Sequence, residues 1–164
     1  MHTFFRSINC VEGKKGCLLI QLPPALSSGS QLQLRELLSL IKEIDKAKEW
    51  KIAVEFRHRS WYHDKIYQLL NSYKAALVVQ DIPKSATPTI DHKSNFMYIR
   101  FHGPTGNYRC SYPEDFLFEY VTCINEWQED GKEVFVYFNN TMGDAMKNLR
   151  ALNKLHNEKI AAHH

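Results

Sequence analysis

Long apolar runs are absent from this sequence. A membrane-spanning helix needs about 18 consecutive apolar residues, and no stretch approaches that length. The start of the chain, MHTFFRSINC, lacks the apolar core of a secretory leader. The four cysteines form no CxxC pair, which is typical of reduced thiols in a reducing compartment. Together these absences predict a cytoplasmic protein.

Strong charge of one sign and glycine-rich motifs are also missing. The chain has 21 basic and 18 acidic residues, and a net charge of +3 is too mild to indicate nucleic-acid binding by itself. No GxGxxG or GxxxxGK[ST] phosphate loop occurs, and no cofactor can be named. A metal site would need three or four of Glu55, His58, Asp81 and His102 to converge. No HExxH-type motif supports one, so no metal site is predicted.

Strand-like and helix-like stretches alternate along the 164 residues, which we treat as a single domain. Short apolar segments rich in β-branched and aromatic residues predict strands at Cys17–Leu22, Ile52–Arg57, Ala76–Asp81, Met97–His102 and Glu133–Asn139. Apolar stripes at helical spacing predict helices near Leu34–Ile44, Ile66–Tyr73, Phe116–Trp127 and Met142–Leu152. Ser30 and Ser111 have the spacing of helix-capping residues, and Pro113 is expected in the first turn of the third helix.

Strand–helix alternation predicts a parallel sheet with helical crossovers. The strands have one wholly apolar face, such as Ile52, Val54 and Phe56, and a second face that becomes polar toward the carboxyl end. An open doubly wound sheet would need two apolar faces, whereas a barrel has outer helices and a mixed interior. The pattern therefore favours a (β/α) barrel with a polar site at the carboxyl ends of its strands.

The same stretches carry a family resemblance. They read LIQLPP (Leu19–Pro24), VEFRHRSW (Val54–Trp61), YIRFHG (Tyr98–Gly103), and YFNNTMGDA followed by Asn148, with Tyr108 and Tyr112 at the positions of a tyrosine pair. In order and spacing, from about Phe5 to Leu155, they resemble the YecE-like family, a domain of unknown function numbered seventy-two. The resemblance implies a TIM barrel whose activity is not established.

Members of that family usually begin with further strand–helix units that carry glycine–tryptophan and glutamate–asparagine motifs, and both motifs are absent here. By this comparison the chain is a partial TIM barrel of about five parallel strands with outer helices, corresponding to strands four to eight. A full barrel typically needs about 250 residues. The open edges at Cys17–Leu22 and Glu133–Asn139 predict self-association or pairing with a separate N-terminal barrel part.

The predicted site collects polar residues from the carboxyl ends of the strands. Glu55 and Arg57 share one strand face, either as an acid/base next to an anion-binding guanidinium or as a structural ion pair. His102 is a candidate base or a hydrogen-bonded structural histidine, and Asp81 is a candidate catalytic carboxylate or a loop cap. The candidate substrate-binding residues are Gln21, Arg57, Arg100, Asn139, Asn140, Trp61 and Tyr108.

Three functions follow from these residues. The first is binding or catalysis on a small polar or anionic substrate, with hydrolysis as the reaction class and Glu55, His102 and Asp81 as the catalytic groups. The second is nucleic-acid binding without chemistry, by a basic and aromatic rim of Arg57, His58, Arg59, Trp61, Tyr108 and Arg109. The third is a truncated barrel with no independent activity. No membrane partner is expected, and the sequence names no substrate.

Overall fold

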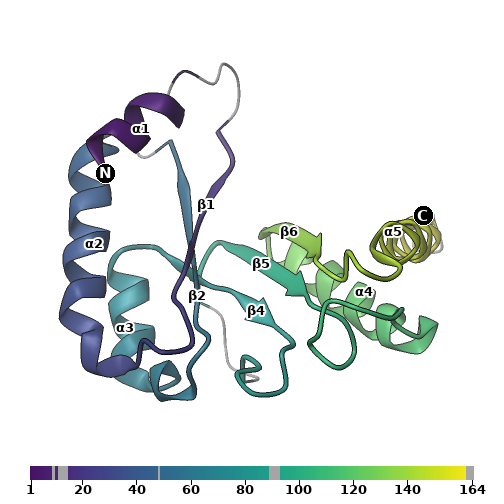
Figure 1. Cartoon of the computed structure of the whole chain (residues 1–164). Coiled ribbons are helices and arrows are strands. Elements are labelled where there is room, and N and C mark those ends of the chain that lie inside the picture. The colour runs from purple at the N-terminus through teal and green to yellow at the C-terminus, as the bar shows by residue number, and fades with distance from the viewer. Residues whose placement is uncertain (9, 11–14, 48, 89–92, 162–164) are drawn as a thin grey trace. The chain divides into compact units, whose positions relative to one another are not determined.

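The structure is a computed structural model, which describes residues 1–8, 10, 15–47, 49–88 and 93–161. Parallel strands alternate with helices, which confirms the α/β class (Figure 1). The strands are β1 (Cys17–Gln21), β2 (Lys51–Glu55), β3 (Ala76–Leu77), β4 (Val79–Gln80), β5 (Phe96–Phe101) and β6 (Glu133–Phe138). The helices are α1 (His2–Ile8), α2 (Gln31–Ile44), α3 (Asp64–Ser72), α4 (Glu114–Glu129) and α5 (Ala145–Ala161), with short 3-10 turns η1 (Ser28–Ser30) and η2 (Arg59–Trp61).

The strands form two parallel three-stranded sheets, in the orders β1-β2-β3 and β4-β5-β6. The prediction of one continuous strand at Ala76–Asp81 is wrong, because it is interrupted at Val78. The Thr87 hydroxyl donates to the Val78 carbonyl at 2.8 Å and accepts from the Gln80 N–H at 3.1 Å. The Thr87 side chain thus satisfies backbone groups that a neighbouring strand would otherwise pair. The two short strands on either side of Val78 pair with different partners, β3 with β2 and β4 with β5.

The chain divides into two compact units, which are described separately. The first comprises Met1–Leu77 with Ile90–Ser94, and the second comprises Val78–Thr89 with Asn95–His164. In the first unit, α2 and α3 lie along one face of the β1–β2 ladder (Figure 1). The predicted apolar face of β2 packs against the predicted stripes of both helices, which confirms the strand parity; the shared core includes Ile52, Val54, Phe56, Leu34, Leu38, Ile41, Ile66 and Leu70.

In the second unit, the apolar face of β5 and β6 packs against α4 and α5. Its core includes Ile99, Phe101, Val134, Val136, Phe138, Leu117, Val121, Ile124 and Leu152. The β5–β6 ladder runs past the end of β6, where the Asn139 N–H donates to the Phe101 carbonyl at 2.7 Å. The face opposite the helices carries the polar residues, as the alternation of side chains requires.

Two predicted helix caps are wrong. Ser30 is the residue before α2, but its side chain makes no capping hydrogen bond. Helix α4 begins at Glu114, so Pro113 precedes it instead of lying in its first turn. The Ser111 hydroxyl is used elsewhere, because it accepts from the side chain of Asn148 at 2.8 Å. Gly131 follows α4 with φ +77°, as its predicted place after the helix requires.

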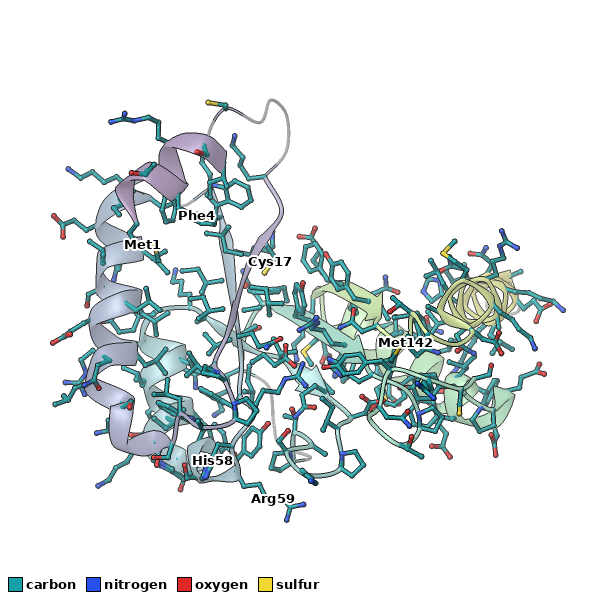
Figure 2. All side chains as sticks on the ribbon, in the orientation of Figure 1. Met1, Phe4, Cys17, His58, Arg59 and Met142 are labelled. Atoms are coloured by element: carbon teal, nitrogen blue, oxygen red, sulfur yellow. The ribbon has the colours of Figure 1, made fainter. Side chains whose placement is uncertain are left out.

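The predicted apolar stripe of α5 is wrong for its two methionines, whereas Leu152 is buried and Ala145 and Leu149 are half-buried. Met142 precedes the helix, and both Met142 and Met146 are 62% exposed (Figure 2). Leu152, Ala151 and Leu155 pack in the apolar core, and Asn148 is the other residue of α5 that is buried. A buried asparagine therefore takes part in the helix face that apolar spacing alone assigned to methionines. Within the described residues, no helix combines the length and apolarity that a membrane span requires.

Candidate functional site

Asp81 and His102 form the centre of a polar cluster in the second unit. Asp81 directly follows β4 and His102 directly follows β5, and these strands pair in parallel with Gln80 opposite Arg100. The carboxyl ends of the two strands therefore meet. Asp81 Oδ1 accepts from the backbone N–H of His102 at 2.8 Å and lies 3.2 Å from His102 Nδ1. One carboxylate oxygen thus fixes both the main chain and the ring of the histidine.

Tyr112 holds the other oxygen of this carboxylate. Its hydroxyl donates to Asp81 Oδ2 and accepts from the backbone N–H of Gly103 at 2.5 Å. Burial, followed by the hydrogen bond to Asp81 and the charge of that carboxylate, raises the pKa of Tyr112 well above its usual range. The phenol therefore stays a hydrogen-bond donor to Asp81 under all ordinary conditions.

Gly103 allows this arrangement because it has no side chain. Its φ is +97°, and a Cβ built there would lie 2.3 Å from the carbonyl oxygen of Arg109. Any other residue would have to adopt a left-handed conformation and move the 103–110 loop. Tyr108 in the same loop also has a positive φ, +65°, which is uncommon for an aromatic residue. Backbone strain of this kind clusters at functional sites.

Asn139 lies against the other ring nitrogen of His102. Its side-chain amide lies 3.3 Å from His102 Nε2 and 2.9 Å from Nε of Arg100. A guanidinium only donates, so the amide oxygen is the atom that faces Arg100 and the ring. Each ring nitrogen of His102 therefore faces an oxygen acceptor, and a hydrogen on either nitrogen is hydrogen-bonded. This geometry suits a histidine that takes up a proton at one ring nitrogen and releases a proton from the other.

Tyr108 completes the surroundings of the histidine. Its ring stands edge-on to the His102 ring, with 5.5 Å between centroids and an interplanar angle of 85°. Its backbone N–H donates to the His102 carbonyl at 2.7 Å. Tyr108 is 38% exposed, whereas His102 is buried. Of the predicted site residues, Asp81, His102, Arg100, Asn139 and Tyr108 therefore lie together in one cluster.

Asn140 occupies a different position. It is fully buried, and its side-chain nitrogen donates to the Cys110 carbonyl at 2.8 Å and to Asn148 Oδ1 at 2.9 Å. Gly143 packs on the same loop, since a Cβ there would lie 2.6 Å from the backbone of Cys110. Asn140 thus joins the end of β6 to the 108–112 loop and to α5. The geometry gives it a supporting role, although a substrate contact was predicted.

Gln21, Glu55 and Arg57 come together in the first unit, as predicted from the strand faces. Gln21 and Glu55 are opposite each other in the β1–β2 register. A guanidinium nitrogen of Arg57 lies 2.7 Å from Glu55 Oε1, and the same nitrogen donates to Gln21 Oε1 at 3.3 Å. The Glu55 side chain is fully buried and that of Arg57 is 7% exposed. The pair therefore satisfies a buried charge, whatever else it does.

Trp61, a candidate substrate-binding residue, lies in the core of the first unit. The residue is fully buried, and its ring lies parallel to that of Phe56, with 4.9 Å between centroids. Its indole N–H donates to the Leu26 carbonyl at 2.7 Å. The ring face of Trp61 is therefore covered by Phe56, and its only polar atom is already hydrogen-bonded within the protein. A large aromatic side chain after a strand was the only signal, and it did not distinguish core from ligand.

Three supporting residues were not predicted to hold the site together. The sequence suggests Tyr112 only as a member of a tyrosine pair that could stack on a ligand, and Asn148 only as part of a motif. Gln80 is buried; its amide nitrogen donates to the Ser85 carbonyl and its oxygen accepts from the Ile82 N–H at 2.8 Å. It thereby shapes the turn that follows Asp81. Its position next to Asp81 on the polar side of a strand was the signal that could have identified it.

Among the described residues, no three His, Cys, Asp or Glu side chains are grouped closely enough to hold an ion. The ligand atoms around His102 are instead a carboxylate, a phenol and an amide, each engaged in a hydrogen bond within the cluster. What the arrangement offers chemically is an oriented imidazole beside a carboxylate.

Comparison with known proteins agrees with the motifs. The UPF0759 protein YunF of Bacillus subtilis (strain 168) is 32% identical over an alignment that covers 58% of this chain and 43% of that protein. A solved DUF72 family protein from Thermotoga maritima MSB8 has a TM-score of 0.62 at 24% identity, covering 97% of this chain and 64% of that one. The chain thus spans less than two thirds of either relative.

The solved relative shows that the fold is shared. The family model described as "Protein of unknown function DUF72" matches residues 1–163, nearly the whole sequence. The YecE-like motifs and this model denote one family. The chain therefore belongs to the DUF72 family.

Proposed function

We propose that the second unit binds a small polar or anionic ligand beside His102, and that His102 transfers a proton to or from it. The observation that carries this proposal is that Asp81 Oδ1 contacts His102 twice. It lies 2.8 Å from the backbone nitrogen and 3.2 Å from the ring Nδ1. A carboxylate that orients an imidazole in this way is the usual partner of a histidine base.

Each neighbour has a role in this proposal. Asp81 keeps the ring in place and supports positive charge on it, while Tyr112 fixes the carboxylate. Arg100 supplies a permanent positive charge behind Asn139, which favours an anionic ligand group. Tyr108 offers an aromatic edge at the surface of the cluster. Hydrolysis is a suitable reaction class, because it needs a base to remove a proton from water.

We further propose that the strand–helix units correspond to strands four to eight of a TIM barrel. The alternation of parallel strands and helices supports this, as does the likeness to the solved family member. TIM-barrel active sites lie at the carboxyl ends of the strands, where Asp81, His102 and Asn139 are found. Glu55 keeps its predicted acid/base role in this scheme, with Arg57 and Gln21 as its binding partners.

An association with further strands is the second part of this scheme. Strands β1 and β6 each have a single neighbour in their sheets within the described part of the chain. We propose that a second copy, or a chain carrying the remaining barrel strands, pairs with these edges. Light scattering on a size-exclusion column, with circular dichroism of the peak, tests this: a discrete folded dimer supports it, and a folded monomer at all concentrations contradicts self-association.

Nucleic-acid binding is a weaker alternative. Of the rim residues that suggested it, Trp61 is in the core and Arg57 is paired with Glu55. Absence of independent activity is the other alternative. Both are separated from the main proposal by the binding experiment below, because each predicts no specific response to small anions.

The experiment is a ligand screen on the folded chain by ligand-observed NMR. Its probes are inorganic phosphate, glycerol 3-phosphate, glucose 6-phosphate and citrate. The expected result is saturable binding of at least one probe, weakened about tenfold or more in His102→Gln, the size of one lost charge-assisted contact. Lys154→Ala, which removes an exposed positive charge elsewhere in the same unit, is the matched control. Equal binding by all three proteins would exclude His102 from the site.

A further inference from the structure

The turn that follows β2 contains a serine and a histidine in direct hydrogen bond. Ser60 Oγ lies 2.8 Å from Nδ1 of His58. The backbone N–H of Ser28, from the segment after β1, donates to the same Oγ at 2.9 Å. Both segments belong to the first unit. His58 is exposed and Ser60 is half-buried, and Figure 2 shows His58 and Arg59 where β1 and β2 end.

The direction of the Ser60–His58 hydrogen bond follows from the donors around it. A backbone N–H can only donate, so Ser60 Oγ is the acceptor toward Ser28. The hydroxyl hydrogen is then left for His58 Nδ1. The backbone N–H of Ser60 also points at Nδ1, at 3.2 Å. Two donors facing Nδ1 require it to be the unprotonated nitrogen, so the ring hydrogen lies on Nε2.

A serine hydroxyl that donates to an unprotonated histidine nitrogen is the arrangement of a nucleophile and its general base. We propose that Ser60 is a nucleophilic serine and His58 its general base, and that the pair acts on carboxylic esters. One lone pair of Oγ accepts from Ser28, and the second is left for an electrophile. The Ser28 N–H also stabilises negative charge as it develops on the oxygen. The proposal is independent of the function proposed for His102, which lies in the other unit and shares none of these residues.

The reaction is balanced with water as the only co-reactant. Ser60 Oγ bonds to the carbonyl carbon as its proton passes to His58 Nδ1. The carbon–oxygen bond to the alcohol breaks, and the leaving oxygen takes the proton from Nδ1. Water then gives a proton to Nδ1 while its oxygen attacks the acyl carbon, and that proton returns to Ser60 as the acid leaves. The sum is ester plus water to acid plus alcohol.

The same histidine also has a structural role, which must be separated from the chemical one. His58 is the N-cap residue of η2, because its side chain accepts from the Ser60 N–H. Asparagine is among the best N-cap residues, since its side-chain oxygen accepts the same hydrogen bond. The variant His58→Asn therefore keeps the cap and removes the base. Ser72 serves as the internal control, because its exposed hydroxyl donates to a backbone carbonyl at 2.7 Å and has no base beside it.

The test treats the whole chain with diisopropyl fluorophosphate, which phosphorylates a nucleophilic serine with loss of fluoride, and locates the adduct by peptide mass spectrometry. The expected result is an adduct on Ser60 about a hundredfold faster than on Ser72, as a positioned base provides. The adduct and the hydrolysis of p-nitrophenyl acetate should both disappear in Ser60→Ala and in correctly folded His58→Asn. The proposal is overturned if Ser60 reacts no faster than Ser72, or if His58→Asn reacts as fast as the wild type.

Discussion

The Tyr112 hydroxyl donates to the carboxylate of Asp81 from across the chain, 31 positions away in sequence. The aromatic ring of Tyr112 meanwhile stacks on Phe116 and packs in the apolar core of the second unit. One residue therefore connects the core under α4 with the carboxylate that orients His102. The stability of this unit and the geometry of the site should respond together when the hydroxyl is removed.

Tyr112→Phe tests this connection. The substitution keeps the ring but leaves the Gly103 N–H and Asp81 Oδ2 without their shared partner, at a cost of about 1–3 kcal/mol in the free energy of unfolding. Chemical denaturation followed by circular dichroism measures it. Tyr120→Phe is the control, since its hydroxyl makes no hydrogen bond among the described residues. Equal effects of the two substitutions would mean that the hydroxyl of Tyr112 does not stabilise the site.

Stability should also depend on the ionisation of Tyr112 at high pH. Its folded-state pKa is raised, first by burial and then by Asp81, whereas in the unfolded chain it titrates near 10. The unfolded state therefore loses the proton first, so the stability contribution is complete below pH 10 and declines as the pH rises above that value. Burial likewise raises the pKa of Tyr120 to about 12, so both residues contribute in this window.

The measurement is the free energy of unfolding between neutral pH and the alkaline range. In the wild type it should fall above the ordinary tyrosine pKa, and the fall should be smaller in Tyr112→Phe. Tyr67 also has a pKa raised by burial, so the difference between the two proteins, rather than the wild-type slope, isolates Tyr112. An identical slope in both proteins would contradict the assignment.

Gly103→Ala should destabilise the second unit by about 3 kcal/mol or more. The new Cβ would meet the Arg109 carbonyl at 2.3 Å and would force a left-handed conformation on alanine. Gly131→Ala is the matched comparison, because Gly131 has a similar φ of +77° but open space around it. That substitution should cost only about 1 kcal/mol, the conformational penalty alone. Thermal unfolding of the two variants separates steric contact from backbone strain.

Arg57→Ala should cost about 3–5 kcal/mol, because it removes the cation that lies 2.7 Å from the buried Glu55 carboxylate. Adding Glu55→Gln to that variant should recover part of the loss, since no buried charge would be left. A double-mutant cycle in denaturant measures the coupling. If the double variant is as unstable as the sum of the single variants, the two side chains are not energetically coupled and the ion pair is not what retains them.

Strand faces and strand ends were readable from the sequence because they depend on local alternation. The apolar set Ile52, Val54 and Phe56 and the polar ends at Asp81, His102 and Asn139 follow from a period of two residues. The interruption at Val78 was not readable, because it depends on the hydroxyl of Thr87, nine positions away. Sequence periodicity does not show which distant side chain will hydrogen-bond to the backbone of a strand.

The supporting residues of the site were missed for a related reason. Tyr112 and Asn148 lie in stretches that read as loop and helix, and their hydrogen-bond partners are 31 and 37 positions away. For Trp61 the sequence left open whether the ring orders the loop after the second strand or stacks on a ligand, because aromatic residues serve both cores and binding surfaces. Residue type alone does not decide between these roles, whereas burial and the contact with Phe56 do.

Strand β6 determines which backbone groups would be available to a strand added at this edge of its sheet. The N–H groups of Glu133 and Asn139 bond toward β5, so the alternate backbone groups of Val134, Val136 and Phe138 point to the other side of the strand. The side chains of these three residues are already fixed in the core against α4. An incoming strand would thus meet donors and acceptors of fixed spacing on a backbone that cannot slide. Because only alternate residues present outward-facing backbone groups, an added strand could pair only in registers that differ by two residues.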